Sequence, residues 1–163
     1  MTLMTPVRFT RSMRKTPQIL NYVLRDVNHE IAHTVTDGPD GWNTLQIICH
    51  LRDFEEIFFD RVRLMVEKER PLLPRYDAHQ MVIDNDYINQ GYRTALMQFS
   101  ELRRKHVEFL EALSPEAWWR SGVHPEHGVI TVLEQSMQVA LHDVDHIEQI
   151  IHMLHTATGP TTA

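Results

Sequence analysis

Apolar residues recur at helical spacing in four long stretches of the chain. In the first stretch, five aliphatic side chains between Leu20 and Ile31 fall on one helix face. The other three stretches begin near Asn43, Asp86 and Thr131 and show the same three- and four-residue spacing. None of the remaining segments alternates convincingly between apolar and polar residues, as a strand would. The pattern therefore predicts an all-α protein, a four-helix bundle.

Local signals set the expected ends of these helices. We expect the first helix to begin near Thr16, with Pro17 at a position where its missing N–H costs nothing. Asn43 and Thr131 are each followed three residues later by glutamine or glutamate, which matches the capping box that opens a helix. We expect the last helix to end near His155.

The segments between the helices indicate how the domain is organised. A chain of 163 residues fits one domain, which we expect to span residues 1–163. Residues 1–15 are expected to form an irregular N-terminal strap, and residues 156–163 a frayed tail. Residues 71–85 contain two prolines and no helical pattern. We expect them to form a long crossover loop between the second and third helices.

Composition narrows the classes of function. The formal net charge is -6, which argues against a nucleic-acid-binding surface. No apolar run has the length needed to cross a membrane, and no apolar core follows the N-terminal basic residues as in a secretory signal. The single cysteine indicates a reducing compartment. We therefore expect a cytoplasmic protein that binds neither nucleic acid nor membranes.

Eleven histidines are a high number. Their positions relative to the apolar face of each predicted helix indicate which of them face solvent and which face the interior. His29 and His33 are four residues apart but fall opposite the apolar face of the first helix, so we expect them to face solvent. His142 and His146 share a face with apolar residues of the last helix. His50 lies at the edge of the apolar stripe of the second helix. We therefore expect these last three imidazoles to point into the bundle.

Three inward imidazoles on neighbouring helices predict a metal site. Neutral imidazoles suit zinc or nickel, with iron or manganese as further candidates. Three protein ligands and one open position are typical of a catalytic site rather than a structural one. The alternative is a set of core histidines whose nitrogens are satisfied by other side chains.

Several short motifs occur in an order found in one known family. They are Gly41-Trp42-Asn43, His50-Leu51-x-Asp53, Arg61, Pro74-Arg75-Tyr76-Asp77, His124-Pro125-Glu126-x-Gly128, and the pair His142 and His146. Together they resemble the DinB-like (damage-inducible) superfamily and, within it, the YfiT-like branch. The resemblance spans about residues 16–155. Leu141 and Asp145 stand where the branch usually has an aromatic residue and a histidine, which leaves the substrate open.

The resemblance implies a four-helix bundle, often in a homodimer, with a divalent metal on His50, His142 and His146. Its members are described as metal-dependent hydrolases or as thiol S-transferases that use bacillithiol, mycothiol or glutathione. We favour transfer of a low-molecular-weight thiol to an electrophilic small-molecule substrate. The first alternative is a hydrolase that uses a metal-bound hydroxide. The second is a stress-related protein that binds metal without turnover.

Position alone suggests roles for four further residues. Asp53 or Glu126 could act as a general base, and Arg75 or Tyr76 could orient an anionic substrate. Four side chains lie one turn from a histidine of the site and could orient its ring, namely Asp53, Gln46, Gln138 and Gln149. Asp143 follows His142 as a glutamate follows the first histidine of zincin proteases. Its shorter side chain makes a protease the less favoured interpretation.

Overall fold

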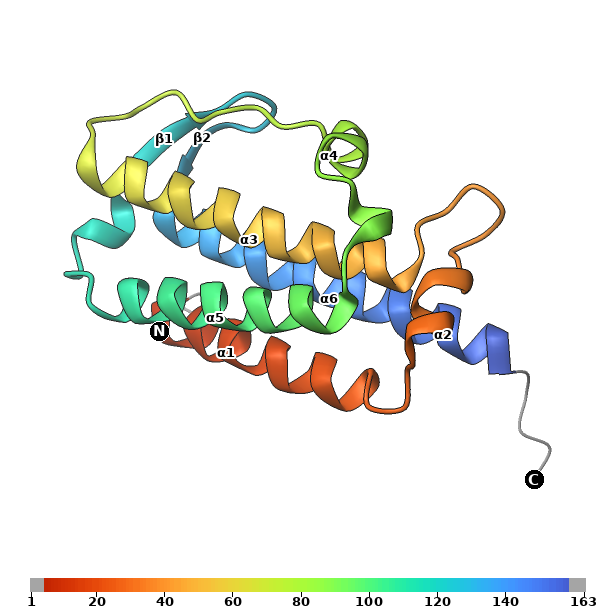
Figure 1. Cartoon of the computed structure of the whole chain (residues 1–163). Coiled ribbons are helices and arrows are strands. Elements are labelled where there is room, and N and C mark those ends of the chain that lie inside the picture. Colours follow the sequence, from red (N-terminus) through yellow and green to blue (C-terminus); the bar gives the residue numbers. More distant parts are fainter. Residues whose placement is uncertain (1–4, 159–163) are drawn as a thin grey trace.

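Four long helices form a bundle, and the shorter elements lie at its ends and along one side (Figure 1). This computed structural model describes residues 5–158. Its elements are, in chain order, α1 (Pro6–Val23), α2 (His29–Thr34), α3 (Thr44–Glu67), α4 (Ala78–Asp84), the short 3-10 turn η1 (Tyr87–Asn89), α5 (Tyr92–Glu111), the 3-10 turn η2 (Ala117–Trp119), β1 (Ser121–His124), β2 (Gly128–Thr131) and α6 (Val132–Thr158). The predicted all-α fold, a four-helix bundle, is confirmed.

The long helices do not simply alternate in direction. α1 and α6 run one way, and α3 and α5 run the other way (Figure 1). Both α3 and α1 pack against α5 and α6. Because the neighbours α3 and α5 run in the same direction, the chain between them must return along the bundle. Residues 68–91 make this return, so the predicted crossover is present, although it contains α4 rather than irregular loop alone.

The first helix begins at Pro6, so the predicted start near Thr16 is wrong. Proline is favourable at the first position of a helix, and Thr10, Met13 and Thr16 are buried on the inner face of α1. The two threonines are polar and therefore hid the helical period in the sequence. The predicted strap is therefore wrong from Pro6 onwards, and residues 1–4 lie outside the described part of the chain. Pro17 lies inside the helix.

The last helix extends beyond its predicted end near His155. α6 continues to Thr158, which accounts for the first residues of the predicted tail. Residues 159–163, the rest of that tail, lie outside the described residues. The capping boxes predicted at Asn43 and at Thr131 are both present.

A short hairpin precedes the last helix, although the sequence pattern predicted no strands. β1 pairs antiparallel with β2, with Ser121 opposite Thr131 at one end. Val123 of β1 also bonds the crossover, because its N–H donates to the Pro71 carbonyl oxygen at 2.8 Å and its carbonyl accepts from Leu73 N–H at 2.9 Å. Each strand has four residues, too few for an alternating pattern to stand out. The hairpin therefore holds the crossover against one end of the bundle.

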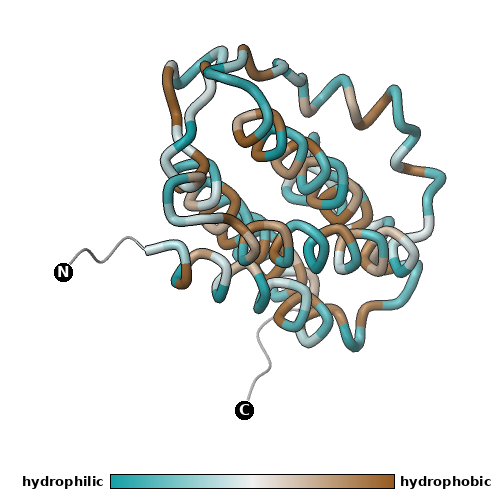
Figure 2. The backbone as a smooth tube through the Cα atoms, turned by 90° about the vertical axis from the view of Figure 1, so that its left-hand side faces the viewer, coloured by the Kyte–Doolittle hydropathy of each residue, from teal (hydrophilic) through white to brown (hydrophobic). Residues whose placement is uncertain are grey.

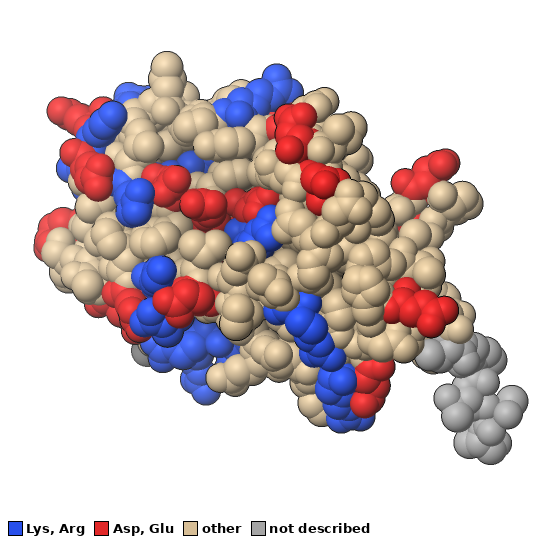
Figure 3. Space-filling view, viewed as in Figure 1, with Lys and Arg blue, Asp and Glu red and all other residues tan. Residues whose placement is uncertain are grey.

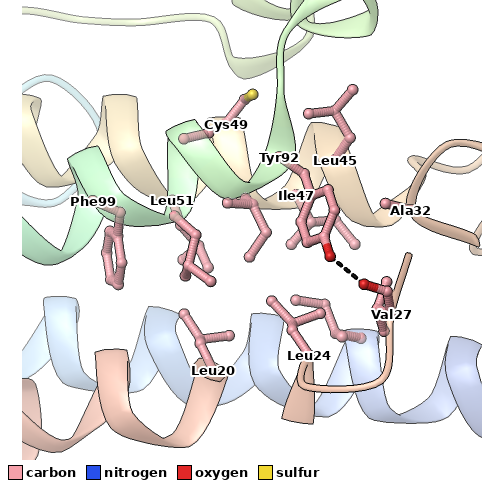
Figure 4. Packing of buried hydrophobic residues seen from close by; sticks show 14 of the residues in the cluster. Leu20, Leu24, Val27, Ala32, Leu45, Ile47, Cys49, Leu51, Tyr92 and Phe99 are labelled. Carbon is pink, nitrogen blue, oxygen red and sulfur yellow. Dashed lines mark hydrogen bonds between the residues drawn. The ribbon is translucent and has the colours of Figure 1, made fainter. Parts of the chain in front are cut away.

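Apolar side chains form two clusters, separated along the helices by a buried ionic layer. Brown and teal segments alternate along the long helices, as expected for amphipathic helices (Figure 2). Figure 4 shows the cluster in which the Tyr92 hydroxyl donates to the Val27 carbonyl oxygen. The second cluster lies toward the hairpin. Arg103, Glu55 and Asp143 are buried between the two clusters. Within residues 5–158, no helix has an apolar stretch long enough to cross a membrane.

Candidate metal centre

His50, His142 and His146 lie together between two antiparallel helices. His50 is on α3, and the other two are one turn apart on α6, which packs against α3. The Nε2 atoms of His50 and His142 are 3.0 Å apart. One nitrogen from each of the three rings lies within 4.8 Å of the others. The structure thus brings together the three imidazoles that were predicted to point inward from neighbouring helices.

Aromatic rings surround the imidazoles on the side of α3. The ring centroid of His50 lies 4.9 Å from that of Trp42 and 4.2 Å from that of Phe54. The ring of His142 lies 5.6 Å from Phe54 and 5.2 Å from Phe58. These contacts restrict rotation of the imidazoles and shield them from water.

The imidazoles are held in their neutral form. Burial, together with the neighbouring histidines, lowers the pKa of His50 to about 2. Burial and the proximity of His146 lower the pKa of His142 to about 3, and burial also lowers the pKa of His146. A neutral imidazole offers a lone pair, which is the form that binds a metal ion.

The distance between two of the ligand nitrogens fits binding to one divalent ion. Nitrogen ligands about 2.0–2.1 Å from a tetrahedral zinc ion lie about 3.3 Å from one another, close to the 3.0 Å between the Nε2 atoms of His50 and His142. At most one hydrogen can lie between these two atoms. If both rings carry their hydrogen on Nδ1, two lone pairs face each other, and a cation would relieve the repulsion. The residues present therefore fit the metal that the resemblance implies.

Gln149 orients one of the rings. Its Oε1 lies 2.8 Å from His146 Nδ1, so the Nδ1 hydrogen donates to the amide oxygen and Nε2 keeps its lone pair. The amide Nε2 of Gln149 in turn donates to Asp37 Oδ2 at 2.8 Å. Gln46, expected in a similar role, instead closes the capping box at the start of α3.

Asp53 lies elsewhere than expected for a base at this site. Its carboxylate accepts hydrogen bonds from Arg52 at 2.6 Å, Tyr87 at 2.7 Å and Asn85 at 2.8 Å. The side chain borders a groove between α3 and α5, where acidic side chains gather in the hollow across the face in Figure 3. His142 borders a different cavity. The structure therefore does not bring Asp53 together with His142.

The other three expected residues do border the cavity beside His142. This cavity has a volume of about 400 Å³ and is closed on one side by the crossover, which supplies Arg75 and Tyr76, and by the hairpin, which supplies Glu126. Arg75 Nη2 lies 3.6 Å from Glu126 Oε1, and both side chains are largely exposed. These residues lie at the rim, where they can contact a bound molecule.

Three buried polar residues of the same cavity were missed as site residues. They are Arg61, His124 and Gln135. For Arg61 the sequence contains a usable signal, because Phe54, Phe58 and Arg61 are spaced three or four residues apart and therefore share one face of α3. His124 was unpredictable as a site residue because the hairpin that places it was not recognised.

Asp143 is not available as a base beside His142. Its carboxylate is 2% exposed and pairs with the guanidinium of Arg103 on the inner side of α6. Thr16 donates a further hydrogen bond to it at 2.6 Å. The similarity to the zincin helix, with Asp143 in the position of the glutamate, is therefore coincidental.

Without metal, the protein should lose stability as the pH falls below about 6.5. His50 and His142 stay neutral when folded but take up protons when unfolded. The unfolded state therefore binds more protons, and the slope approaches about 1.4 kcal/mol per pH unit for each histidine. Urea unfolding of chelated protein between pH 7 and 4.5 measures this slope. In the variant His142→Ala, this slope should be smaller by the contribution of one histidine. The exposed control Leu141→Ala should leave the slope unchanged. Equal slopes in all three proteins would contradict the prediction.

Comparison with known proteins places the chain in one family. The family model of the DinB superfamily matches residues 12–150. Two proteins of Oceanobacillus iheyensis, both named as predicted metal-dependent hydrolases, are similar to the chain. The first is 28% identical over 134 residues, which cover 82% of this chain and 77% of the relative. The second is 24% identical over 151 residues, which cover 93% and 82%.

A solved structure shows the same fold. YfiT from Bacillus subtilis, described as a probable metal-dependent hydrolase with an unusual four-helix bundle topology, superposes with a TM-score of 0.89. The match covers 97% of this chain and 90% of YfiT at 19% sequence identity. The family model spans most of the chain, and the bundle with its crossover has the YfiT topology. The chain therefore belongs to the DinB superfamily and has a YfiT-like fold.

Proposed function

We propose that this protein is a divalent-metal enzyme that acts on a small molecule in the cavity beside His142. The observation that carries the proposal is the set of three neutral imidazoles whose ligand nitrogens lie within 4.8 Å of one another. His50, His142 and His146 would hold the ion, and His142 also borders the cavity. Zinc or nickel is the preferred metal, with iron or manganese as further candidates.

The bound ion would lower the pKa of a water or thiol in its open position, which provides a nucleophile near neutral pH. The side chains of the cavity would do the rest. Phe54 and Phe58 exclude water from the imidazoles, and Glu126 can accept a proton at the rim. Arg75 and Tyr76 can orient an anionic substrate from the crossover. The catalytic role of Glu126 and the positioning roles of Arg75 and Tyr76 are part of this proposal.

As the reaction, we propose transfer of a low-molecular-weight thiol to an electrophilic substrate. The thiol sulfur forms a bond to the electrophilic carbon, the leaving group departs with its electron pair, and the thiol proton passes to a base such as Glu126. Thiol chemistry makes a small demand on that base, because a free thiol has a pKa of about 8.5, far below that of water. A strong general base is absent from the described lining of the cavity, because Asp53 lies in another groove and Glu126 pairs with Arg75. Such a cavity suits a thiol better than water as the nucleophile.

Hydrolysis is the second candidate, and the names of the two Oceanobacillus relatives favour it. In that reaction water attacks an ester or amide carbon, and Glu126 accepts the proton of the water. The bond to the alcohol or amine breaks, and this group leaves with the electron pair and takes up the proton. Metal binding without turnover, in a stress-related protein, is the third possibility. The homodimer and the cytoplasmic location remain predictions that rest on the resemblance and the composition.

Turnover assays of the zinc- and nickel-loaded protein separate these reactions. We expect consumption of 1-chloro-2,4-dinitrobenzene or monochlorobimane only when glutathione or cysteine is present, and at a rate above the uncatalysed one. The variant His142→Ala should abolish this increase, and the exposed control His29→Ala should retain it. Cleavage of p-nitrophenyl acetate without thiol would instead select hydrolysis. No turnover of any of these substrates by fully metal-loaded protein would contradict the thiol-transfer proposal and favour the binding protein.

A further inference from the structure

Two side chains that border the cavity beside His142 each have a buried polar atom without a hydrogen-bond partner. These atoms are Arg61 Nε, a donor, and Gln135 Oε1, an acceptor. Both side chains border the cavity, and the residues are only 6% and 1% exposed. Buried polar groups nearly always have a partner in folded proteins. An unpaired donor and an unpaired acceptor on one cavity therefore point to a ligand that supplies both partners.

Arg61 is moreover a buried cation without a counter-ion. Its Nη2 donates to the carbonyl oxygen of Pro74 at 2.7 Å, and this carbonyl carries no net charge. Among residues 5–158, no carboxylate forms an ion pair with Arg61, and the nearby Glu126 is paired with Arg75. The guanidinium of Arg61 instead lies 5.7 Å from the ring centroid of Tyr76, which carries no net charge. Burial accordingly lowers the pKa of Arg61 below its ordinary value. An anion that enters the cavity can therefore pair with the positive charge of Arg61.

Arg103 is also a buried arginine, but it has the carboxylate counter-ions that Arg61 lacks. Arg103 is 1% exposed, and its guanidinium contacts the carboxylates of Glu55 and Asp143. Both arginines have an unpaired Nε, so that atom alone does not distinguish them. The difference is the counter-ion, since removing a charge from water is costly unless an opposite charge accompanies it. The fold supplies two carboxylates to Arg103 and none to Arg61.

The rest of the cavity indicates what the ligand looks like. Backbone N–H groups of Glu126 and His127 donate to His124 Nδ1 at 3.2 and 3.3 Å, so the hydrogen of this ring is on Nε2. His124 therefore adds a second donor to the lining that contains Arg61. Phe54 and Phe58 provide apolar walls suited to a flat or aliphatic body. A volume of about 400 Å³ suits a small molecule.

We propose that this cavity binds the substrate through an anionic group, a carboxylate or a phosphate, which Arg61 holds while Gln135 accepts a hydrogen bond from a hydroxyl or N–H group of the same molecule. The proposal rests on the proposed function only in calling this ligand a substrate of the metal centre. The anion site itself rests on Arg61, Gln135 and the cavity.

Binding of simple probes to the metal-free, full-length protein tests the proposal. Met137 borders the cavity, so the resonance of its ¹³C-labelled methyl group reports binding, and Met137→Leu identifies that resonance. Benzoate, phenyl phosphate and benzyl alcohol share an aromatic ring but differ in charge. We expect one of the two anions to bind at least about tenfold more tightly than the alcohol, because charge-assisted hydrogen bonds form only with the anion. The tighter anion distinguishes a carboxylate site from a phosphate site.

Variants then assign the binding to Arg61. Arg61→Met should weaken anion binding at least about tenfold and leave the alcohol unaffected, whereas Arg63→Met, an exposed control on the same helix, should change neither. If Arg61→Met does not fold, Arg61→Lys provides the test, since it retains the charge but loses the planar fork and should bind anions more weakly than the wild type. Equal affinity for the anions and the alcohol, or unchanged anion affinity in the variant that folds, would overturn the proposal.

The same titrations separate this proposal from the metal-enzyme proposal. A protein that binds benzoate through Arg61 but takes up no zinc or nickel would retain the anion site and refute the metal-dependent function. A protein that takes up zinc or nickel at the histidines but binds neither anion would refute the anion site alone. The two proposals therefore fail on different measurements.

Discussion

Replacing Arg103 by methionine is expected to lower the free energy of unfolding by about 3–5 kcal/mol. The guanidinium donates to Glu55 Oε2 at 2.8 Å, to Asp143 Oδ1 at 2.8 Å and to the carbonyl oxygen of Met13 at 3.0 Å. Arg103 on α5 therefore joins α3, α6 and α1. Without it, two carboxylates remain buried among apolar clusters, and their remaining side-chain partners are His106 at Glu55 and Thr16 at Asp143. Neither partner carries a fixed positive charge. Urea unfolding at pH 7 measures the loss.

The neighbouring Arg104 provides a matched control. It lies on the exposed face of α5 and pairs with Glu101 and Glu108. Exposed ion pairs contribute about 0–1 kcal/mol, so Arg104→Met should be nearly neutral. A loss below about 1 kcal/mol for Arg103→Met would show that the buried layer contributes little, contrary to the energetics expected of buried charges.

A compensated variant tests whether the loss comes from the stranded carboxylates. Combining Arg103→Met with Glu55→Gln and Asp143→Asn removes all three charges together. Replacing a whole buried ionic cluster by neutral residues is often close to neutral in stability. The triple variant should therefore recover a large part of the loss. A triple variant less stable than Arg103→Met alone would contradict this explanation.

Removing the histidines of the metal centre is expected to have the largest effect on activity. The double variant His142→Ala, His146→Ala leaves only His50 as a ligand, and one imidazole cannot hold a divalent ion against solvent. Turnover should fall at least about a hundredfold, because the ion contributes several kcal/mol to the chemical step and each 1.4 kcal/mol corresponds to a factor of ten. The comparison uses kcat/KM of the two proteins after the same treatment with zinc or nickel.

Gln149→Leu provides a graded comparison for that result. It keeps all three ligands but removes the acceptor of the His146 Nδ1 hydrogen. Loss of such a supporting hydrogen bond typically costs about 10–100-fold in metal affinity or activity. Its effect should therefore lie between those of the wild type and the double variant. Undiminished turnover in the double variant would show that the three imidazoles are not the reactive centre.

Helix phase was sufficient to locate the three histidines. His50, His142 and His146 were expected to point inward because they share faces with apolar residues, and the structure places their rings in contact. The same reasoning set aside His29 and His33, which lie on the short α2 rather than at the end of the first helix, so the predicted continuous helix is wrong there.

The errors have identifiable physical causes. Asp53 is only one turn from His50, but that turn rotates its side chain toward the groove that α5 lines. Arg103 and Glu55 appeared in the sequence as charged residues of amphipathic helices, which are normally solvated. Only the packing of four helices shows that they are buried together. Such pairings connect residues far apart in the chain, and no local pattern reveals them.

The arginine of the cavity illustrates the same limit. Arg61 follows the phase of Phe54 and Phe58, so its inward direction is predictable from the sequence. Its missing counter-ion is not, because that depends on how the crossover and the hairpin close over α3. Those segments also place Arg75, Tyr76 and Glu126 at the rim of the cavity.

Metal analysis of the purified protein tests the central claim most directly. The wild type and the His142→Ala, His146→Ala variant would be prepared without a metal-affinity tag and measured by mass spectrometry of the elements after reconstitution with zinc and with nickel. The account predicts about one divalent ion per chain in the wild type and its loss in the variant. A wild type that holds no zinc or nickel after reconstitution, or a variant that holds as much as the wild type, would contradict it.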